Sequence, residues 1–357
     1  MIDGTKEWRR LRWSGWRFSP HAQVRCLTIV ATPLTSVVDM AVEMASGSGE
    51  LCRVLSLDGG GAKGFYTLGI LKEVEGLLGG PLHEHFNLIF GTSTGAIIAA
   101  LLALGHDVET IHRLYKQHVP TIMRGRNAKE RSAALAHLTN VVFGEKTFLD
   151  AKTGIGIVAT HWVEEKPMIF KASIAQAHGR QGTFTPGFGC TIGDAVRASC
   201  SAYPFFKRPV IKTSKGDHVE LVDGGYCANN PTLYAIADAL IALKRPPESI
   251  RVLSLGVGNY PEPKPKLLRR LKRRIDEVFL DVQLLQKTLN INTASMEQLR
   301  WILYKDAIRT VRINDTFEKP EMATDLLEWD LKKLDILYQR GSESFAKREI
   351  ELRDLLK

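Results

Sequence analysis

A serine between two glycines is the residue whose type and spacing point most directly to chemistry. Ser93 lies in the segment Gly91–Gly95, which has the G-x-S-x-G form of a nucleophile elbow. Glycines at both flanks allow a serine to occupy a strained turn between a strand and a helix. The apolar runs 86–90 and 95–104 predict that strand and that helix. Ser93 is therefore the candidate nucleophile of a hydrolase.

A serine hydroxyl needs a base to take its proton, and the chain order favours an aspartate for this role. Hydrolases of the α/β class usually place a histidine after the acid, in the order Ser, Asp or Glu, His. All ten histidines precede Asp223, and the last of them is His218. Asp223 begins an Asp-Gly-Gly triplet with Gly224 and Gly225. The simpler interpretation is a Ser93–Asp223 dyad; the alternative is a histidine that arrives from upstream in an unusual order.

A glycine-rich segment upstream can meet the negative charge that forms on a substrate carbonyl. The segment Asp58–Gly64 follows the predicted strand 53–57, so Gly59, Gly60 and Gly61 can expose consecutive N–H groups at the start of a helix. The absence of side chains lets the carbonyl approach the backbone closely. We therefore expect these three glycines to form an oxyanion hole.

The same motifs have other interpretations. The spacing of Gly59, Gly61 and Gly64 also suits a nucleotide-binding turn, which would make the chain a nucleotide-binding protein. Such a turn needs an acid about 20 residues later, and the segment 90–93 at that place has none. The Asp-Gly pair at Asp223 is also a common turn dipeptide. The occurrence of three motifs in order favours the hydrolase.

These motifs and their order resemble those of the patatin-like phospholipases. That family carries a D-G-G-G-x-[KR]-G oxyanion loop, a G-x-S-x-G nucleophile and a D-G-[GA] motif that supplies the aspartate of a Ser-Asp dyad. The matching segments are 58–64, 91–95 and 223–225, and the resemblance covers roughly residues 53–260. A catalytically silent scaffold of the same family is the alternative that the motifs leave open.

The resemblance implies a serine lipid acyl hydrolase of the phospholipase A type. Its substrate would be a membrane phospholipid, from which Ser93 as nucleophile and Asp223 as general base cleave an ester-linked fatty acid. No metal or other cofactor is required for this chemistry. The residues that would support the motifs are Gly64, Gly91, Gly95, Gly224 and Gly225.

The order of the predicted elements indicates an α/β protein. From residue 53 onward strands alternate with helices, which predicts a mostly parallel sheet with helices on both faces. The resemblance implies the patatin-like three-layer α/β/α form of this fold. We expect an N-terminal extension at 1–50, a catalytic domain at 51–260, and an appended C-terminal helical region at 261–357 packed on it. From residue 276 onward the pattern predicts helices alone.

Composition limits the partners and the compartment. With 357 residues, 44% of them hydrophobic, the chain can bury one large domain and an appended part. Its five cysteines lack C-x-x-C spacing, which predicts neither a zinc site nor a disulfide framework and favours a reducing cytoplasm. The longest apolar stretch, 96–104, is far shorter than the ~20 residues of a membrane span, so no transmembrane helix is expected.

The first fifty residues differ from the rest in composition. Tryptophans and arginines alternate there before a short apolar run at 27–31. This pattern is compatible with a signal peptide, with a membrane-surface arm or with a start site assigned too early. We favour an accessory or partly artefactual N-terminus.

The net charge of +9 is concentrated in the segment 264–274. The apolar positions that follow keep helical spacing, which predicts a basic amphipathic helix with either a solvated charged face or contact with anionic lipid head groups. The segment lacks the aromatic residues of a nucleic-acid motif, so no nucleic-acid partner is expected.

The whole chain is also similar to bacterial patatin-like effectors that cyclic dinucleotides switch on in anti-phage defence. This second resemblance implies a cyclic dinucleotide activator, a homo-oligomer, and action at the inner face of the membrane from the cytoplasm. The residues expected to contact phosphate or lipid are Arg269, Arg270 and Arg274.

Overall fold

The computed structural model of the chain describes residues 50–261 and 273–357, except for the side chains of 273–282. The described residues form one compact unit. The predictions for residues 1–49 and for Arg269 and Arg270 lie outside the described residues. Arg274 belongs to a described helix, but its side chain also lies outside them.

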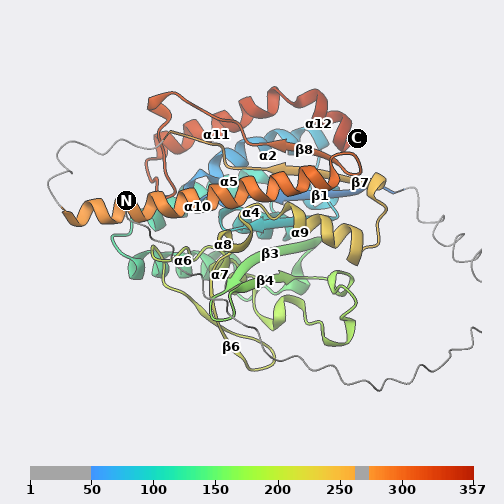
Figure 1. Ribbon diagram of the computed structural model, residues 1–357, viewed down its shortest axis with the longest axis horizontal. Coiled ribbons are helices and arrows are strands. Elements are labelled where there is room, and N and C mark those ends of the chain that lie inside the picture. Colours follow the sequence, from blue (N-terminus) through green and yellow to red (C-terminus); the bar gives the residue numbers. More distant parts are fainter. Residues whose placement is uncertain (1–49, 262–272) are drawn as a thin grey trace, which may run out of the picture. The chain divides into compact units, whose positions relative to one another are not determined.

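Eight strands form one mixed sheet in this unit (Figure 1). They are β1 Cys52–Leu57, β2 Leu88–Thr92, β3 Gly154–His161, β4 Lys166–Lys171, β5 Val210–Lys212, β6 His218–Asp223, β7 Ile250–Leu255 and β8 Arg309–Ile313. The order across the sheet is β5-β6-β3-β2-β1-β7-β8, and β4 also pairs with β3. The neighbouring pairs β3-β2, β2-β1, β1-β7 and β7-β8 are parallel. The pairs β4-β3, β6-β3 and β5-β6 are antiparallel. The predicted mostly parallel central sheet is confirmed.

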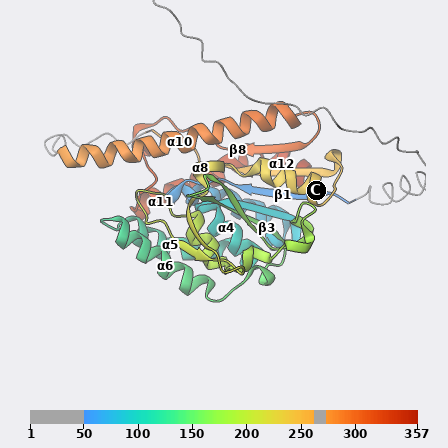
Figure 2. The same cartoon turned by 60° about the horizontal axis from the view of Figure 1, so that its bottom comes forward.

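Helices cover both faces of this sheet. They are α2 Gly64–Leu78, α3 Leu82–His85, α4 Thr94–Ala103, α5 Val108–Met123, α6 Ala128–Phe143, α7 Ile192–Ser199, α8 Gly225–Ala228, α9 Thr232–Ala237, α10 Arg273–Tyr304, α11 Leu331–Ala346 and α12 Glu349–Leu356. Successive side chains of β1 point to opposite faces, so Leu55 and Leu57 pack with α2 and α4, whereas Cys52 and Val54 pack with α9. Figure 2 shows α10 and α4 on opposite sides of the sheet. The predicted three-layer α/β/α arrangement is confirmed.

The C-terminal region contributes a strand to the sheet as well as helices. The prediction of helices alone after residue 276 is wrong there, because β8 pairs with β7 from Arg309 to Ile313. The buried residues Val311 and Ile313 alternate with Thr310 and Arg312, a short pattern that is weak in the sequence. The charge of Arg312 is met by Asp58, which is distant in the sequence. β8 thereby brings the C-terminal region to the glycine-rich loop.

Strand register brings the predicted dyad together. β2 pairs in parallel with β3, with Thr92 opposite Val158, so Ser93 follows at the level of Ala159. β6 runs antiparallel to β3, and its last residue, Asp223, is also paired with Ala159. Asp223 thus reaches the level of Ser93 through the register of an antiparallel strand, and not as the end of another parallel strand.

Within the described part of the chain, no helix has the length and apolar character needed to cross a membrane.

Candidate active site

Ser93 occupies a strained turn between β2 and α4. Its backbone angles are φ 52° and ψ −121°, a combination that costs a non-glycine residue on the order of 1–3 kcal/mol. The turn depends on the flanking glycines. A Cβ atom on Gly91 would lie 2.2 Å from the carbonyl oxygen of Gly95, and one on Gly95 would lie 2.3 Å from the carbonyl oxygen of Leu57. The G-x-S-x-G spacing is therefore required by close packing as well as by the turn itself.

The backbone of Ser93 is held by residues at the end of α7. Its N–H donates to Ser199 Oγ at 2.9 Å, and Ser199 Oγ donates to the carbonyl oxygen of Val158 at 2.6 Å. The thiol of Cys200 donates to the carbonyl oxygen of Ser93, with a sulfur–oxygen distance of 3.1 Å. These bonds fix the strained backbone and do not use the Ser93 hydroxyl.

Asp223 is buried in the cavity that Ser93 also lines, and the Ser93 side chain is close enough to lower the pKa of the Asp223 carboxyl by hydrogen bonding. The Asp223 carboxylate also accepts the N–H of Gly225 at 2.7 Å. Its backbone is fixed by Ser201, whose carbonyl oxygen accepts the Asp223 N–H at 3.1 Å, and by Thr160, whose hydroxyl donates to the Asp223 carbonyl oxygen at 3.0 Å. The carboxylate is therefore rigidly placed against the serine.

Burial raises the pKa of Asp223 to about 7. Desolvation of the charged carboxylate is the largest cause, and the hydrogen bonds from Gly225 and Ser93 act in the opposite direction. A base works best when its pKa lies near the working pH, because it is then both ionised and able to hold a proton. The Asp223 carboxyl is suited to take the proton of Ser93.

The glycine-rich loop between β1 and α2 lines the same cavity as the dyad through Gly60 and Gly61. The N–H of Gly59 donates to the carbonyl oxygen of Asn229 at 2.9 Å, so this amide already has a partner. Gly61 has φ +59°, and a Cβ atom on it would lie 2.3 Å from the carbonyl oxygen of Leu326. The expected set of three oxyanion donors narrows to Gly60 and Gly61.

The other glycines of the motifs lie at the ends of the elements that carry the site. Gly64 is the first residue of α2, and Gly224 and Gly225 directly follow β6. A Cβ atom on Gly224 would lie 2.1 Å from the carbonyl oxygen of Val158. Gly224 therefore allows the chain after Asp223 to pass against β3.

An apolar cavity extends from the dyad into the core and has a volume of about 640 Å³, its open mouth included. Its apolar side chains come from α4, α5, α6 and α10 and from the segments 205–206 and 326–327. They are Ile97, Val119, Ile122, Met123, Leu135, Phe205, Phe206, Leu285, Leu289, Leu326 and Leu327. Each methylene group buried in such a cavity contributes about 0.8 kcal/mol, so an acyl chain is a favourable occupant.

Some residues at the site carry no clear signal in the sequence. Leu285 and Leu289 line the cavity from α10, and their apolar spacing is equally typical of a helix that only packs on the core. The sequence around Asn229 does not indicate the contact of this residue with Gly59, which is set by the fold. Within the described residues, no group of three or more His, Cys, Asp or Glu side chains is arranged to hold a metal ion.

Comparisons with known proteins identify relatives of the chain. Residues 55–236 match the family model for patatin-like phospholipase. The chain is 64% identical over 310 residues to an Escherichia coli protein named cUMP-AMP-activated phospholipase, which covers 87% of this chain and 95% of the relative. It is 27% identical over 215 residues to a cGAMP-activated phospholipase of Pseudomonas aeruginosa, covering 57% of this chain and 61% of that one. The crystal structure of VipD from Legionella pneumophila aligns with a TM-score of 0.45 and 13% identity, over 86% of this chain and 67% of VipD.

Proposed function

We propose, from the premise that the chain belongs to the patatin-like phospholipase family, that it cleaves ester-linked fatty acids from membrane phospholipids with Ser93 as nucleophile and Asp223 as general base. The observation that carries the proposal is the position of Ser93, on a strained turn, in the same cavity as the buried Asp223 carboxyl, whose pKa is raised to about 7. The cavity at this pair has an apolar lining, which suits the acyl chain of the substrate.

The first half of the reaction forms an acyl-enzyme. Ser93 Oγ attacks the ester carbonyl carbon while its proton passes to the Asp223 carboxylate. The carbonyl electron pair moves onto oxygen, and the N–H groups of Gly60 and Gly61 stabilise the resulting oxyanion. When the carbonyl re-forms, the bond to the alcohol oxygen of the lysophospholipid breaks, and this oxygen takes the proton from Asp223.

The second half releases the fatty acid. A water molecule attacks the acyl-enzyme carbonyl and gives a proton to Asp223. The same two amides stabilise the second oxyanion. Its collapse breaks the bond to Ser93 Oγ, which recovers the proton, and the fatty acid leaves.

We further propose that a cyclic dinucleotide activates the enzyme and that it acts as an effector of anti-phage defence at the inner face of the membrane. The support is the name of the 64% identical relative, a cUMP-AMP-activated phospholipase, which aligns over 87% of this chain. Activation by such a ligand is compatible with a homo-oligomer as the active form. Phospholipid hydrolysis would then begin only after the signal appears.

Fatty acid release from mixed phospholipid vesicles tests both parts of this proposal. Wild-type protein is incubated with vesicles alone and with a panel that includes cUMP-AMP and cGAMP. Release that depends on one cyclic dinucleotide supports a gated phospholipase, and equal release without any of them supports constitutive hydrolysis. Absence of release under every condition would favour the silent scaffold.

The oxyanion loop gives a prediction of its own. We expect Gly61→Ala to lower kcat about 100-fold, because the new Cβ atom meets the carbonyl oxygen of Leu326 at 2.3 Å and the backbone has φ +59°. Both effects displace the amides of the loop, and the loss of one oxyanion donor typically costs about 10²–10³ in rate. Hydrolysis of a soluble short-chain ester measures kcat without the complication of a lipid surface.

Gly79→Ala is the matched control for this change. Gly79 has φ +72°, but nothing lies within 4 Å of the position that its Cβ atom would take. This variant therefore carries the backbone strain without the displaced loop, and its kcat should remain within a factor of two of the wild type. An unchanged kcat in Gly61→Ala, in a protein of wild-type melting temperature, would show that the loop is not the oxyanion hole.

A further inference from the structure

A second cavity lies next to the glycine-rich loop and shares no lining residue with the active-site cavity. It lies between the loop, β8 and α10 and has a volume of about 700 Å³, its open mouth included. Its lining residues are mostly polar: Asp58, Asn229, Val257, Asn259, Asn290, Thr293, Ala294, Glu297, Arg312 and Asn314.

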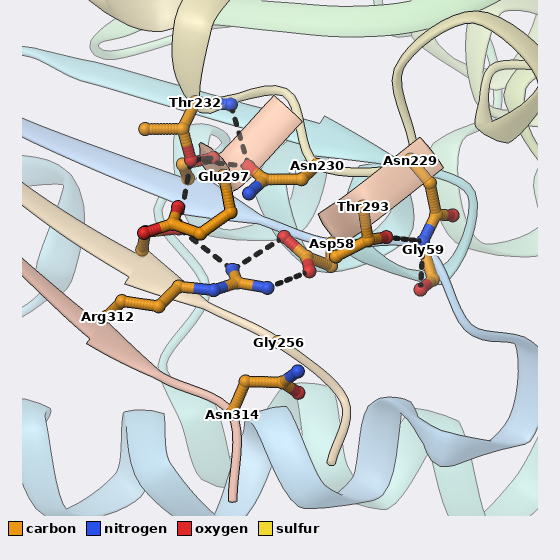
Figure 3. A network of polar contacts seen from close by, with 12 residues as sticks. Asp58, Gly59, Asn229, Asn230, Thr232, Gly256, Thr293, Glu297, Arg312 and Asn314 are labelled. Carbon is orange, nitrogen blue, oxygen red and sulfur yellow. Dashed lines mark hydrogen bonds and ion pairs between the residues drawn. The ribbon is translucent and has the colours of Figure 1, made fainter. Parts of the chain in front are cut away.

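An ion pair forms one wall of this cavity, as Figure 3 shows. Arg312 Nη1 donates to Asp58 Oδ1 at 2.9 Å and to Ser254 Oγ at 2.8 Å, and Nη2 donates to Asp58 Oδ2. Only 2% of the Asp58 side chain and 14% of the Arg312 side chain are exposed. A buried pair of this kind contributes little net stability, because desolvation offsets the attraction. The ion pair does fix the position of β8 relative to the start of the glycine-rich loop.

The charges of the cavity are largely balanced. Asp58 neutralises Arg312, and Glu297 pairs with Arg300 at 2.6 Å. A bare phosphate group therefore has little excess positive charge to bind. The remaining polar side chains that line the cavity are those of Thr293 and four asparagines, Asn229, Asn259, Asn290 and Asn314. Asn314 Oδ1 accepts the Gly258 N–H at 2.9 Å, and Asn259 Nδ2 donates to Thr316 Oγ1 at 3.3 Å. The Asn314 amide nitrogen, the Asn259 amide oxygen and the Asn290 amide are the groups that this leaves for a ligand.

Side-chain amides and carboxylates are the groups that recognise the edges of nucleobases. An asparagine amide can pair with two atoms of adenine, and a glutamate can accept from an exocyclic amino group. Asn290 and Glu297 line the cavity from α10, and Asn259 and Asn314 line it from the segments after β7 and β8. A flat base in this cavity can be contacted along its edge by these side chains.

One side chain connects this cavity to the oxyanion loop. Asn229 Nδ2 donates to Thr293 Oγ1 at 2.7 Å and to the carbonyl oxygen of Gly59 at 3.2 Å (Figure 3). The Asn229 backbone carbonyl accepts the Gly59 N–H at 2.9 Å, and its own N–H donates to Asn292 Oδ1 at 2.8 Å. A shift of α10 at Thr293 is therefore passed to Gly59, the residue before the two proposed oxyanion donors.

We propose that this cavity binds a nucleobase of the activating cyclic dinucleotide, and that Asn229 transmits its occupancy to the oxyanion loop. This inference rests on the proposed activation, and it adds the site where the activator binds and the path from that site to the oxyanion loop. A ligand changes a conformational equilibrium only if it binds the two states differently. A base that contacts both α10 and the segments after β7 and β8 binds differently when α10 shifts. The same shift at Thr293 is passed through Asn229 to the loop, so binding of the base and the state of the loop are coupled.

A tryptophan placed in the cavity tests the site. Ala294 is exposed on α10 and lines the cavity, whereas its neighbour Ser295 is exposed and does not line it. Binding of cUMP-AMP to the full chain is measured by calorimetry, and its effect on fatty acid release is measured with vesicles. Ala294→Trp should weaken binding at least tenfold and remove most of the stimulation. Ser295→Trp should keep both within threefold of the wild type.

The outcomes separate the site from the activation that it assumes. If wild-type protein neither binds cUMP-AMP nor is stimulated by it or by cGAMP, the proposed activation fails. If the wild type is stimulated and Ala294→Trp binds and responds equally well, the cavity is not the site. Should Ala294→Trp fail to fold, Asn290→Ala replaces it, with an expected tenfold loss of affinity at an unchanged melting temperature. Wild-type affinity in that variant overturns the proposal as well.

The route through Asn229 has a separate test. Thr293→Val keeps the size of the side chain and removes the hydroxyl that accepts from Asn229 Nδ2. We expect it to reduce stimulation about tenfold while affinity for cUMP-AMP changes much less, and Thr293→Ser should restore stimulation. A parallel loss of binding and stimulation, or no loss of either, would overturn this route.

Discussion

Replacing Ser93 with alanine is expected to lower fatty acid release from phospholipid vesicles by about 10⁴-fold or more, with or without a cyclic dinucleotide. The reason is that the proposed reaction passes through an ester of Ser93 Oγ, and no other nucleophile takes its place. The measurement is the initial rate of fatty acid release by wild type and Ser93→Ala at equal protein concentration.

The fold should survive this change. The bonds that hold the turn use the backbone of Ser93: its N–H donates to Ser199, and its carbonyl oxygen accepts from Cys200. Ser93→Ala should therefore melt at the wild-type temperature and bind cUMP-AMP with wild-type affinity. These two controls separate loss of the nucleophile from loss of structure. Retained hydrolysis in Ser93→Ala would rule out the dyad.

The parts of the site that the sequence predicts are those whose causes are local. Gly91 and Gly95 are needed because the turn at Ser93 brings them into contact with nearby backbone, and this need is visible as a five-residue motif. The three-layer fold is equally accessible, because the alternation of strands and helices from residue 53 onward extends along the chain. Both the tight turn and the periodic pattern can therefore be recognised from the sequence alone.

The parts that the sequence does not predict depend on contacts between distant segments. Arg312 meets Asp58 across 254 positions of the chain, and neither residue type alone indicates the other. The hydrogen bond from the Gly59 N–H to the Asn229 carbonyl oxygen also joins residues far apart in the sequence. A glycine motif therefore cannot show which of its N–H groups remain free to bind a substrate. The strand β8 is missed for a related reason. Its arginines make the segment polar, and its alternation of buried and partly buried residues becomes clear only from its pairing with β7.

Asp223→Asn is expected to remove catalysis, and the pH dependence of the wild type should identify the same residue. A base must be ionised to accept a proton, and the pKa of Asp223 is raised to about 7. The wild-type kcat/KM for a soluble ester should therefore rise about tenfold per pH unit below pH 7 and level off above it. Asp223→Asn should lose about 10³–10⁴ in kcat at every pH. A wild-type profile that is flat down to pH 5 would contradict the assignment.

The same substitution should stabilise the folded protein. A carboxyl whose pKa is about 7 when folded and near 3.8 when unfolded binds its proton more tightly in the folded state. The free energy of unfolding therefore falls as the pH rises from about 4 to about 7 and stays low above that range, with an upper limit near 4 kcal/mol at about 1.4 kcal/mol per pKa unit. Asp223→Asn has no charge to bury, so it should melt higher than the wild type at pH 8 and equally at pH 4.

Asp223→Ala distinguishes the buried charge from the hydrogen bond. The asparagine variant keeps an oxygen that accepts the Gly225 N–H, which the wild type binds at 2.7 Å, whereas the alanine variant leaves this buried donor without its acceptor. A donor left in this state costs about 1–3 kcal/mol, so Asp223→Ala should gain less stability than Asp223→Asn. A carboxylate with a purely structural role would lose both stability and activity in the asparagine variant. Higher stability with lost activity is the result expected of a catalytic base kept in an unfavourable environment.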